Sequence, residues 1–586
     1  MANLNTRAKA EHTYDAIVVG SGITGGYAAK ELTEKGLKTL VLERGPMVRH
    51  IEDYPTAQTP PWEAKYPRGK LPPAELREHY KVQQRTGYAV TEYSKHFFVK
   101  DDENPYTEDK PFDWIRGNHL GGRSLMWGRQ TYRLSEMDFE SNAKDGNGSD
   151  WPIRYDDIAP WYSHVERFIG VSGSKEGLPQ LPDGEFLPPF ALNDPEKDFA
   201  AKIAKSFPGR RVIPGRCAHL TEPQPHHLEL GRVQCQVRSL CDRGCSYGAY
   251  HSSLSSSLPA ANKTGNLTTI TDAVVHSVIH DPKTGKATGV RVIDAHTKEA
   301  RTYEAKVIFL CASTIGTAQI LLNSRSAANP NGLGNGSDMV GRYLLDHIMV
   351  SMVGSYPGFE DSFYRGRRPT GFYIPRFRNV TEKGEFVRGF GFQGGLSRMG
   401  WKAAWQPSTG IGAPTKEKAR HPGQWLLHLT AFGEMLPNRD NRVTLHPTKT
   451  DQWGIPQVHI ECVHGPNERK MAGQMQSDGE AMILAAGAQI YKPEKVASSS
   501  TVKPPEPGEL GDPGLAIHEM GTACMGKDPR TSVLNKYNQV HDVPNLFVTD
   551  GAAMASGGCQ NPSITYMALS ARAAYHATEF LKAGTI

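Results

Sequence analysis

Three glycines near the N-terminus have the spacing that dinucleotide binding requires. They form Gly20-x-Gly22-x-x-Gly25, which follows the apolar run 16–19 and precedes a helical stretch to about Lys35. Gly20 suits a tight turn, Gly22 lets the backbone approach a pyrophosphate, and Gly25 lets the helix pack on the strand. The helix N-terminus adds unpaired N–H groups and a positive dipole end for the phosphates. We therefore expect a dinucleotide site here.

A glutamate selects among the dinucleotides. Glu43 follows a second apolar run, 39–42, at the tip of the expected second strand. Its carboxylate can accept hydrogen bonds from both ribose hydroxyls and repels a 2′-phosphate, so FAD or NAD fits better than NADP. The simpler alternative is a glycine-rich turn without a ligand, but the complete order of strand, turn, helix, strand and acid favours binding.

Three cysteines form a second candidate site. Cys235, Cys241 and Cys245 lie within eleven residues of a 586-residue chain that has eight cysteines, too few for a disulfide scaffold. Thiolates clustered this closely indicate a metal site. The sequence contains no C-x-x-C, which argues against a zinc finger or a thioredoxin-type site, and no C-x-x-C-H for a c-type haem. The alternative is three ordinary buried cysteines.

The elements that must position these residues alternate between strands and helices. Further apolar runs predict four strands, at 270–276, 289–293, 306–310 and 545–548. The run 306–310 leads through the small residues 311–316 into a helix, which is again typical of a turn that faces a cofactor. A last helix is expected after Asn561, with Pro562 at its start.

The composition changes along the chain and predicts two domains of discontinuous sequence. We expect a cofactor-binding domain built from the nucleotide-type segments 1–50, 110–135, 265–330 and 510–586. The intervening segments are richer in Pro, Trp, Tyr and charge or contain long strand-like stretches. We expect them to form a substrate-binding domain from 51–109, 136–264 and 331–509, with the cysteine-bearing segment 235–245 inside it.

Charge and hydropathy exclude some classes of function. The net charge is +5, from 67 basic and 62 acidic residues, without a run of five like charges, so nucleic acid is not expected as a partner. No stretch approaches 18 uninterrupted apolar residues, so no membrane-spanning helix is expected. Residues 1–15 lack an apolar h-region and a twin arginine, so we expect no export signal on the chain itself.

Three further motifs carry a family resemblance. They are Gly117-Asn-His-Leu-Gly-Gly122, His518-Glu-Met-Gly-Thr522, and a segment from Asn545 through Asp550-Gly551 to Asn561-Pro562. Their order and spacing resemble the glucose–methanol–choline (GMC) family of FAD oxidoreductases along the whole chain. More narrowly, the chain is similar to the bacterial sugar-dehydrogenase large subunits, including the fructose, gluconate, glucose and glucoside 3-dehydrogenases. The resemblance implies an α/β fold, with a GMC-type Rossmann-like FAD-binding domain and an inserted α+β substrate domain built on an antiparallel sheet.

The resemblance assigns the catalytic pair. It implies that His518 is the base that takes the proton of the substrate hydroxyl, and that Asn561 is its partner. The chemistry agrees, because oxidation of an alcohol removes a proton from oxygen and a hydride from carbon. Imidazole has a pKa suited to the proton, and flavin N5 suits the hydride. A neutral amide can hold the same oxygen without competing for the proton.

The resemblance also assigns cofactor contacts. Asn118, Gly121 and Gly122 are expected near the flavin ring and the pyrophosphate. Asp550 and Gly551 are expected at the pyrophosphate and the ribityl chain, and Val274 or Val275 at the adenine. The helix that starts at Pro562 is expected to face the N1–C2=O edge of the flavin, where its dipole stabilises the reduced anion. His119 could attach flavin covalently, but relatives place that histidine a few residues later, where this chain has Leu125 and Met126, so we expect non-covalent FAD.

In the sugar-dehydrogenase branch, three cysteines at this spacing hold a [3Fe–4S] cluster. Three ligands suit three irons, and such a cluster relays electrons singly from a two-electron flavin. The resemblance therefore implies Cys235, Cys241 and Cys245 as ligands, with a small subunit and a cytochrome c electron acceptor as partners. It also implies transport to the bacterial periplasm as a folded passenger of the partner subunit. The alternative is a cytoplasmic enzyme that uses a diffusible acceptor.

The leading functional hypothesis is an FAD-dependent dehydrogenase that oxidises a secondary or anomeric hydroxyl of a sugar or glycoside and passes electrons through the cluster to a cytochrome or other acceptor. The alternative enzyme is a pyranose-oxidase-like protein that uses O₂. A non-catalytic FAD-binding scaffold is a third hypothesis, against which His518 and Asn561 argue. The expected substrate half also contributes polar residues that could contact a sugar or be structural: Asp346, His347, His428, Glu434 and Arg439.

Overall fold

The structure is a computed structural model of the 586-residue chain. It describes residues 14–360, 371–398, 411–490 and 510–586, apart from 61–62, 64, 66–68, 87–88 and 421. Residues 1–13, on which most of the expectation about an export signal rests, lie outside this part. No helix in the described ranges is long and apolar enough to cross a membrane.

The N-terminal nucleotide-binding unit forms as the glycine spacing predicts. Strand β1 (Tyr14–Val19) is followed by helix α1 (Ile23–Glu34) and strand β2 (Thr39–Leu42). The two strands pair in parallel, with Ala16 opposite Thr39. Since helices cover both faces of a parallel sheet, its strands are apolar on both sides, which explains the unbroken apolar runs.

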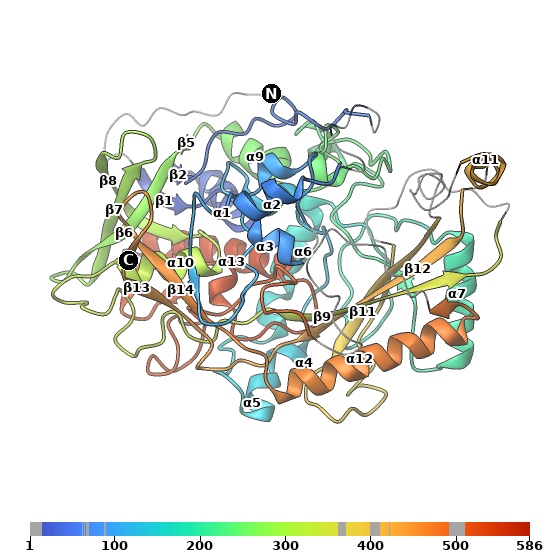
Figure 1. The fold of residues 1–586 in the computed structure, drawn as a ribbon. Coiled ribbons are helices and arrows are strands. Elements are labelled where there is room, and N and C mark those ends of the chain that lie inside the picture. Colours follow the sequence, from blue (N-terminus) through green and yellow to red (C-terminus); the bar gives the residue numbers. More distant parts are fainter. Residues whose placement is uncertain are drawn as a thin grey trace.

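In the described chain this unit is part of a mixed sheet of eight strands. Six of them have the order β16-β17-β8-β1-β2-β5, while β7 pairs with β8 and β6 pairs with β7. Strands β2, β1, β8, β17 and β5 run parallel. Figure 1 shows this sheet on one side of the molecule, with α10 and α13 beside it. The bounds are β5 (Leu267–Ile270), β6 (Ala273–Asp281), β7 (Lys286–Asp294), β8 (Ala300–Leu310), β16 (Gln539–Val540), β17 (Val543–Val548), α9 (Leu258–Lys263), α10 (Thr314–Asn323) and α13 (Ser563–Lys582).

One predicted strand is wrong in its extent. The run 270–276 is not a single strand, because β5 ends at Ile270 and β6 begins at Ala273. Asp272 between them has a φ of 55°, in the left-handed region, so the chain turns there. The two turn residues, Thr271 and Asp272, are polar and half-buried, so the polar pair marks the break that the strand prediction passed over.

A six-stranded antiparallel sheet in the described residues faces the other side of the molecule, with the order β15-β9-β12-β11-β10-β4. Figure 1 shows α12 and α7 beside it. Along β9 and β12, buried positions alternate with partly exposed ones, so one face packs on α12 and the other carries the partly exposed side chains. The bounds are β4 (Ile213–Pro214), β9 (His347–Tyr356), β10 (Phe372–Ile374), β11 (Phe390–Arg398), β12 (Trp425–Glu434), β15 (Gln489–Ile490), α7 (Asp194–Ser206) and α12 (Pro466–Ala485).

A small sheet and short helices complete the described chain. The small sheet pairs β13 (Arg442–Thr450) with β14 (Pro456–Glu461), and β14 with β3 (Thr107–Glu108). The remaining α-helices are α2 (Pro73–His79), α3 (Lys81–Thr86), α4 (Glu136–Phe139), α5 (Ser141–Asp145), α6 (Tyr155–Ile169), α8 (Pro225–Leu228) and α11 (Ala413–Arg420).

The expected α/β class is confirmed, and the second sheet is antiparallel as expected. The division of the sequence into two domains stays a prediction. What the topology does establish is that β1, β8 and β17 end at the same edge of the large sheet, at Val19, Leu310 and Val548. Ligands of parallel sheets bind outside this carboxyl edge.

Candidate active site

A cavity of about 740 Å³ opens at the carboxyl edge of the large sheet. Its wall includes Val19 at the end of β1 and, from the six-stranded sheet, Met349, Gln393 and Phe432. The cavity therefore lies between the two sheets, and its volume is typical of a pocket that encloses a cofactor and a small substrate.

The three glycines have the geometry that their spacing predicts. Gly20 has a φ of 95°, and a side chain there would meet the carbonyl oxygen of Cys311 at 2.4 Å. A Cβ on Gly25 would lie 1.9 Å from the carbonyl oxygen of Gly20, so α1 packs directly on the turn. Gly22 lines the cavity, and a Cβ there would meet nothing within 4 Å. The backbone at Gly22 thus faces open space that a pyrophosphate can fill.

Three helix N-termini within the described residues meet this cavity. They belong to α1, α10 and α13, whose first residues or caps, Gly22, Ser313 and Pro562, line it. No side chain caps any of the three in the structure. Their unpaired N–H groups and positive dipole ends favour a negatively charged ligand. A pyrophosphate and a reduced flavin both meet this requirement.

Glu43 lies at the tip of β2 and lines the cavity. It is 6 % exposed and accepts hydrogen bonds from the Ser21 N–H at 3.1 Å, the Ser21 hydroxyl at 2.5 Å and the Gly45 N–H at 2.9 Å. Burial raises the pKa of this carboxyl above its ordinary value, against these hydrogen bonds. The contacts fix the carboxylate where the ribose is expected.

The other predicted cofactor residues also gather here. Asn118, Gly122, Val274, Val275 and Gly551 line the cavity. Asp550 lines it as well and accepts from the Thr317 hydroxyl at 2.5 Å and the Ala552 N–H at 2.9 Å. Burial raises the pKa of Asp550 to about 6.

Three residues of the Gly117–Gly122 motif, namely His119, Leu120 and Gly121, are absent from the cavity wall of the described structure. Gly121 has a φ of 86° and donates its N–H to the Ser21 hydroxyl at 2.9 Å, so it braces the phosphate turn. His119 is buried, and its Nδ1 bonds the Leu120 carbonyl at 2.9 Å. His119 is absent from the cavity wall of the described chain, and the non-covalent attachment of FAD stays a prediction.

The two predicted catalytic residues meet in the cavity wall. His518 and Asn561 both line the cavity, and Asn561 Nδ2 lies 3.2 Å from His518 Nε2. The two residues are 43 positions apart in sequence and come from the loop before β16 and the start of α13. Burial, with His347 and Arg123 nearby, lowers the pKa of His518 well below its ordinary value. The imidazole is therefore neutral and able to accept a proton at physiological pH.

His347 defines which nitrogen of His518 is free. His347 Nε2 lies 2.9 Å from the carbonyl oxygen of Gly558, which can only accept, so this nitrogen carries the proton. His347 Nδ1 is then an acceptor, and it lies 2.9 Å from His518 Nδ1, which must donate. The tautomer assigned from this network leaves His518 Nε2 with its lone pair toward Asn561.

Asp346 holds the loop of His518 through hydrogen bonds to its backbone. It is fully buried and accepts from the backbone N–H groups of Ala516 at 3.0 Å and His518 at 2.9 Å. Burial, with the negative charge of Glu519 nearby, raises the pKa of Asp346 to about 7. The sequence offered Asp346 and His347 only as polar residues of the substrate half. Their adjacency at the start of β9 was the available signal, but it does not reveal a partner 170 residues away.

The other polar residues of that group have structural contacts. Glu434 is buried and pairs with Arg388 at 2.7 Å. Arg439 is half exposed and lies 3.6 Å from Asp338. His428 lies in β12. Within the described chain none of these three residues lines the cavity.

One of the three cysteines lines the same cavity. It is Cys241, while Cys235 and Cys245 are half-buried and absent from the cavity wall of the described chain, and none of the three is in a disulfide. Burial raises the pKa of Cys235 to about 12, and the neighbouring Cys241 and Cys245 add to the rise. In the described residues the sulfurs are not close enough together to bind one metal ion. A cluster makes a different demand, because each cysteine binds a different iron.

A buried arginine lies near one of these cysteines, Cys245. Arg232 is fully buried and donates to the carbonyls of Gly248 and Ile169, each at 2.9 Å, while its third nitrogen has no partner in the described residues. Burial lowers the pKa of Arg232 to about 9, and Cys245 opposes this shift. No carboxylate of the described chain pairs with Arg232, so it is a buried cation without a counter-ion there.

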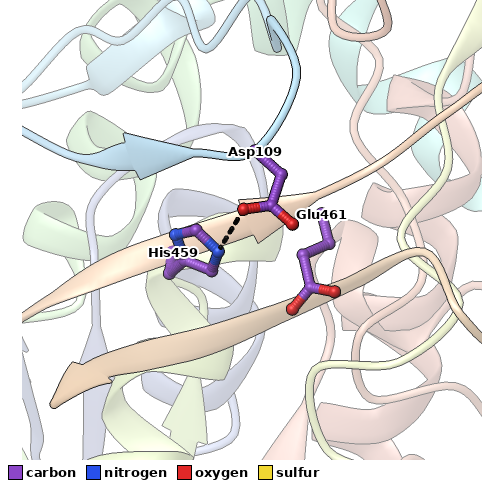
Figure 2. Close-up of side chains that lie close together, drawn as sticks. All are labelled: Asp109, His459 and Glu461. Atoms are coloured by element: carbon purple, nitrogen blue, oxygen red, sulfur yellow. Dashed lines mark ion pairs between the residues drawn. The ribbon is translucent and has the colours of Figure 1, made fainter.

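A different set of side chains is the one group in the described chain with single-ion spacing. The group contains His459 and Glu461 of β14 and Asp109, which follows β3, as Figure 2 shows. His459 Nε2 lies 3.2 Å from Asp109, and Glu461 is already paired with Arg442 at 3.0 Å. These contacts explain the group as surface ion pairs, and no residue of it lines the cavity.

Comparisons with known proteins agree with this geometry. Two family models described as GMC oxidoreductase match residues 229–349 and 437–570, and a model of an NAD(P)-binding Rossmann-like domain matches 18–54. The chain is 29 % identical to 2-methyl-1,2-propanediol dehydrogenase of Mycolicibacterium austroafricanum, over 95 % of this chain and 94 % of the relative. It is 26 % identical to the fructose dehydrogenase large subunit of Gluconobacter japonicus, over 97 % and 98 %.

A solved structure shares the fold. Pyridoxine 4-oxidase from Mesorbium loti matches with a TM-score of 0.58 at 15 % identity, over 96 % of this chain and 99 % of the other. The family expected from the motifs is thus confirmed, and the similarity to the fructose dehydrogenase subunit supports the bacterial sugar-dehydrogenase branch. FAD is the cofactor that this family and the cavity have in common. The chain belongs to the GMC oxidoreductase family, whose members act on CH–OH groups.

Proposed function

We propose that the protein is an FAD-dependent dehydrogenase that oxidises a secondary or anomeric hydroxyl of a sugar or glycoside. The observation that carries the proposal is the unprotonated Nε2 of His518 beside Asn561 Nδ2, in the same cavity as the glycine turn and three helix N-termini. A substrate hydroxyl that replaces the hydrogen bond between these two nitrogens donates to His518 and accepts from Asn561.

The chain's residues account for the proton side of the reaction. His518 Nε2 takes the hydroxyl proton while its Nδ1–H stays bonded to His347, so the cation that forms is stabilised in place. Asn561 Nδ2 donates a hydrogen bond to the substrate oxygen, and this bond becomes stronger as negative charge develops on the oxygen. When bound, FAD supplies the acceptor for the hydride that leaves the carbon, and the products are a carbonyl compound and reduced FAD.

A substrate screen tests this proposal. Purified protein with bound FAD is mixed with sugars, glycosides and simple diols, with a dye acceptor in one series and O₂ alone in the other. We expect dye reduction with a sugar or glycoside, with a keto or lactone product by NMR, and little H₂O₂. Stoichiometric H₂O₂ would instead support the pyranose-oxidase-like alternative. Turnover of diols only, without any sugar, would contradict the substrate class.

The cofactor is expected to be held without a covalent bond. The basis is the cavity lined by Gly22 and Glu43 and the absence of His119 from its wall in the described chain. Acid precipitation of the protein should release all of the flavin into the supernatant. A yellow pellet that resists extraction would contradict this prediction.

The proposal extends to electron exit through an iron–sulfur cluster held by Cys235, Cys241 and Cys245. Its support is the position of Cys241 in the cavity wall and the buried, unpaired Arg232 near Cys245. We expect three irons and acid-labile sulfide per chain after anaerobic purification. Cys241→Ser is expected to lose the iron and to slow oxidation of the reduced protein far more than its reduction by substrate, as stopped-flow absorbance would show.

A matched control separates cluster loss from general damage. Cys462→Ser changes a buried cysteine that is absent from the cavity wall of the described chain, and it should keep the iron. Iron-free wild-type protein, purified without oxygen, would show that the three cysteines are structural.

The proposal also includes a partner and a location. The relative from Gluconobacter japonicus is, by its name, the large subunit of its enzyme. By analogy this chain pairs with a small subunit and a cytochrome c acceptor, and reaches the periplasm as a folded passenger. Fractionation of the native host, with co-purification, tests this. Recovery in the cytosol only, without a co-purifying small protein, would favour the cytoplasmic alternative and leave the flavin chemistry unaffected.

A further inference from the structure

The amide of Asn561 has two different ends, and only one of them serves the proposed reaction. Its Nδ2 donates hydrogen bonds, while its Oδ1 only accepts. His518 Nε2 carries a lone pair, so Nδ2 must face it, and a rotation of the amide by half a turn would place two acceptors against each other. Something on the other side of Asn561 must therefore favour the productive orientation.

Gln393 occupies that other side. It lies in β11, is half-buried, lines the cavity and directs its Nε2 to Asn561 Oδ1 at 2.6 Å. This is the shortest bond of a continuous series, which runs from Gln393 through Asn561 and His518 to His347 and ends on the Gly558 carbonyl. Every member from Asn561 to His347 donates toward Gly558, so the series has one direction.

We propose that Gln393 is a positioning residue that holds the Asn561 amide with its donor end toward His518, and so keeps His518 Nε2 unprotonated. The inference rests on the proposed role of His518 as the base. It goes beyond the catalytic pair because Gln393 comes from the six-stranded sheet, 125 residues before His518 (393 to 518). The substrate half would then determine the protonation pattern of the base as well as binding the sugar.

One substitution at Gln393 removes the donor of its hydrogen bond to Asn561 and puts an acceptor in its place. In Gln393→Glu the new side chain is nearly the same size, but when ionised it can only accept hydrogen bonds. It then competes with His518 for the Asn561 donor and turns the amide, so that Oδ1 faces His518. His518 is then stabilised with a proton on Nε2 in addition to the Nδ1–H that is bonded to His347, and this cation can no longer take a proton from a substrate.

The first measurement does not need a substrate. In protein labelled with [¹⁵N]histidine, the His518 signal is assigned by its absence in His518→Gln. We expect wild-type protein at pH 8 to show a protonated Nδ1 and a free Nε2. Gln393→Glu at the same pH should show a protonated Nε2. An unchanged tautomer in Gln393→Glu would overturn the proposal.

The second measurement is flavin reduction by an oxidisable sugar across pH. At pH 8 the variant should be slower by on the order of 10²-fold, the size of a lost general base. Its rate should recover as pH falls, because the introduced carboxyl, with an ordinary pKa of about 4.3 raised by partial burial, then protonates and donates to Asn561 again. The titratable and charged groups around His518 are the same in both proteins: His347, Arg123 with its partner Glu519, and Asp346, which accepts from the His518 backbone N–H.

The control is Thr430→Val, which removes a polar group directly opposite Gln393 in β12. It should keep the wild-type tautomer and rate. A variant Gln393→Glu that is slow at every pH and keeps the wild-type tautomer would mean that Gln393 is only structural. If no sugar reduces the wild-type flavin but the tautomer changes as expected, the proposed substrate fails while the role of Gln393 stands.

Discussion

His518→Ala is expected to retain FAD and to lose reduction of the flavin by substrate by on the order of 10²–10⁴-fold, the usual cost of removing a general base. The cofactor should stay bound because its predicted contacts, from the glycine turn to Asp550, lie elsewhere on the cavity wall. His347 Nδ1, which accepts from His518 in the wild type, does not replace the base, because His347 is absent from the cavity wall of the described chain. Stopped-flow absorbance of the flavin under anaerobic conditions measures the effect.

The pH dependence of the wild-type protein gives an independent check on the same group. Burial lowers the pKa of His518 well below 6.5, so the neutral base persists as the pH falls through 6.5. The rate of reduction should therefore remain level there and decline only at lower pH. Asn561→Asp is the companion variant, and it should slow reduction because a carboxylate opposes an oxygen that is becoming negative. Reduction of His518→Ala at the wild-type rate would refute the assignment.

Alanine at Gly22 and alanine at Gly25 are expected to fail in different ways. At Gly22 the added methyl group occupies open space in the apoprotein but lies where the pyrophosphate is expected. Apoprotein stability should stay within about 0.5 kcal/mol of wild type. FAD affinity should fall by about tenfold or more, where tenfold corresponds to 1.4 kcal/mol.

At Gly25 the methyl group would sit 1.9 Å from the Gly20 carbonyl oxygen, and backbone must move to admit it. Overpacking of this kind costs about 1–3 kcal/mol, so both urea stability and FAD affinity should fall. Gly473→Ala is the control, since it lies inside α12 with nothing within 4 Å, and it should gain about 0.5–1 kcal/mol. Tight FAD binding by Gly22→Ala would show that the phosphates lie elsewhere.

The cofactor half of the fold was predictable because its signals are local. Glycines 20, 22 and 25 and the acid at 43 lie within one strand–helix–strand unit, and each is constrained by its own turn or close contact. The predicted strands 289–293, 306–310 and 545–548 fall inside β7, β8 and β17. The exception at 270–276 arises because the polar pair Thr271 and Asp272 is a turn, in which Asp272 has a positive φ, and not part of a strand.

The supporting part of the site could not be predicted, because its residues meet through tertiary structure alone. His347 lies in β9 and Gln393 in β11, two strands that β12 separates, while Asn561 and His518 lie in the C-terminal part of the chain. A histidine or glutamine in a strand has many uses, and only its partner shows which one applies. The cysteine spacing was visible, but the buried cation beside it, Arg232, had no sequence signal.

The bond from His347 to the Gly558 carbonyl has a consequence for how the enzyme resets after each turnover. A carbonyl oxygen has no proton to pass on, so a proton that reaches His347 from His518 has no exit inward. The proton taken from the substrate must leave His518 through Nε2, the side that faces the cavity. Water can reach that nitrogen only when the oxidised product has moved away. His518 is thus deprotonated only after the product has left, and the proton leaves by the same opening through which the substrate enters.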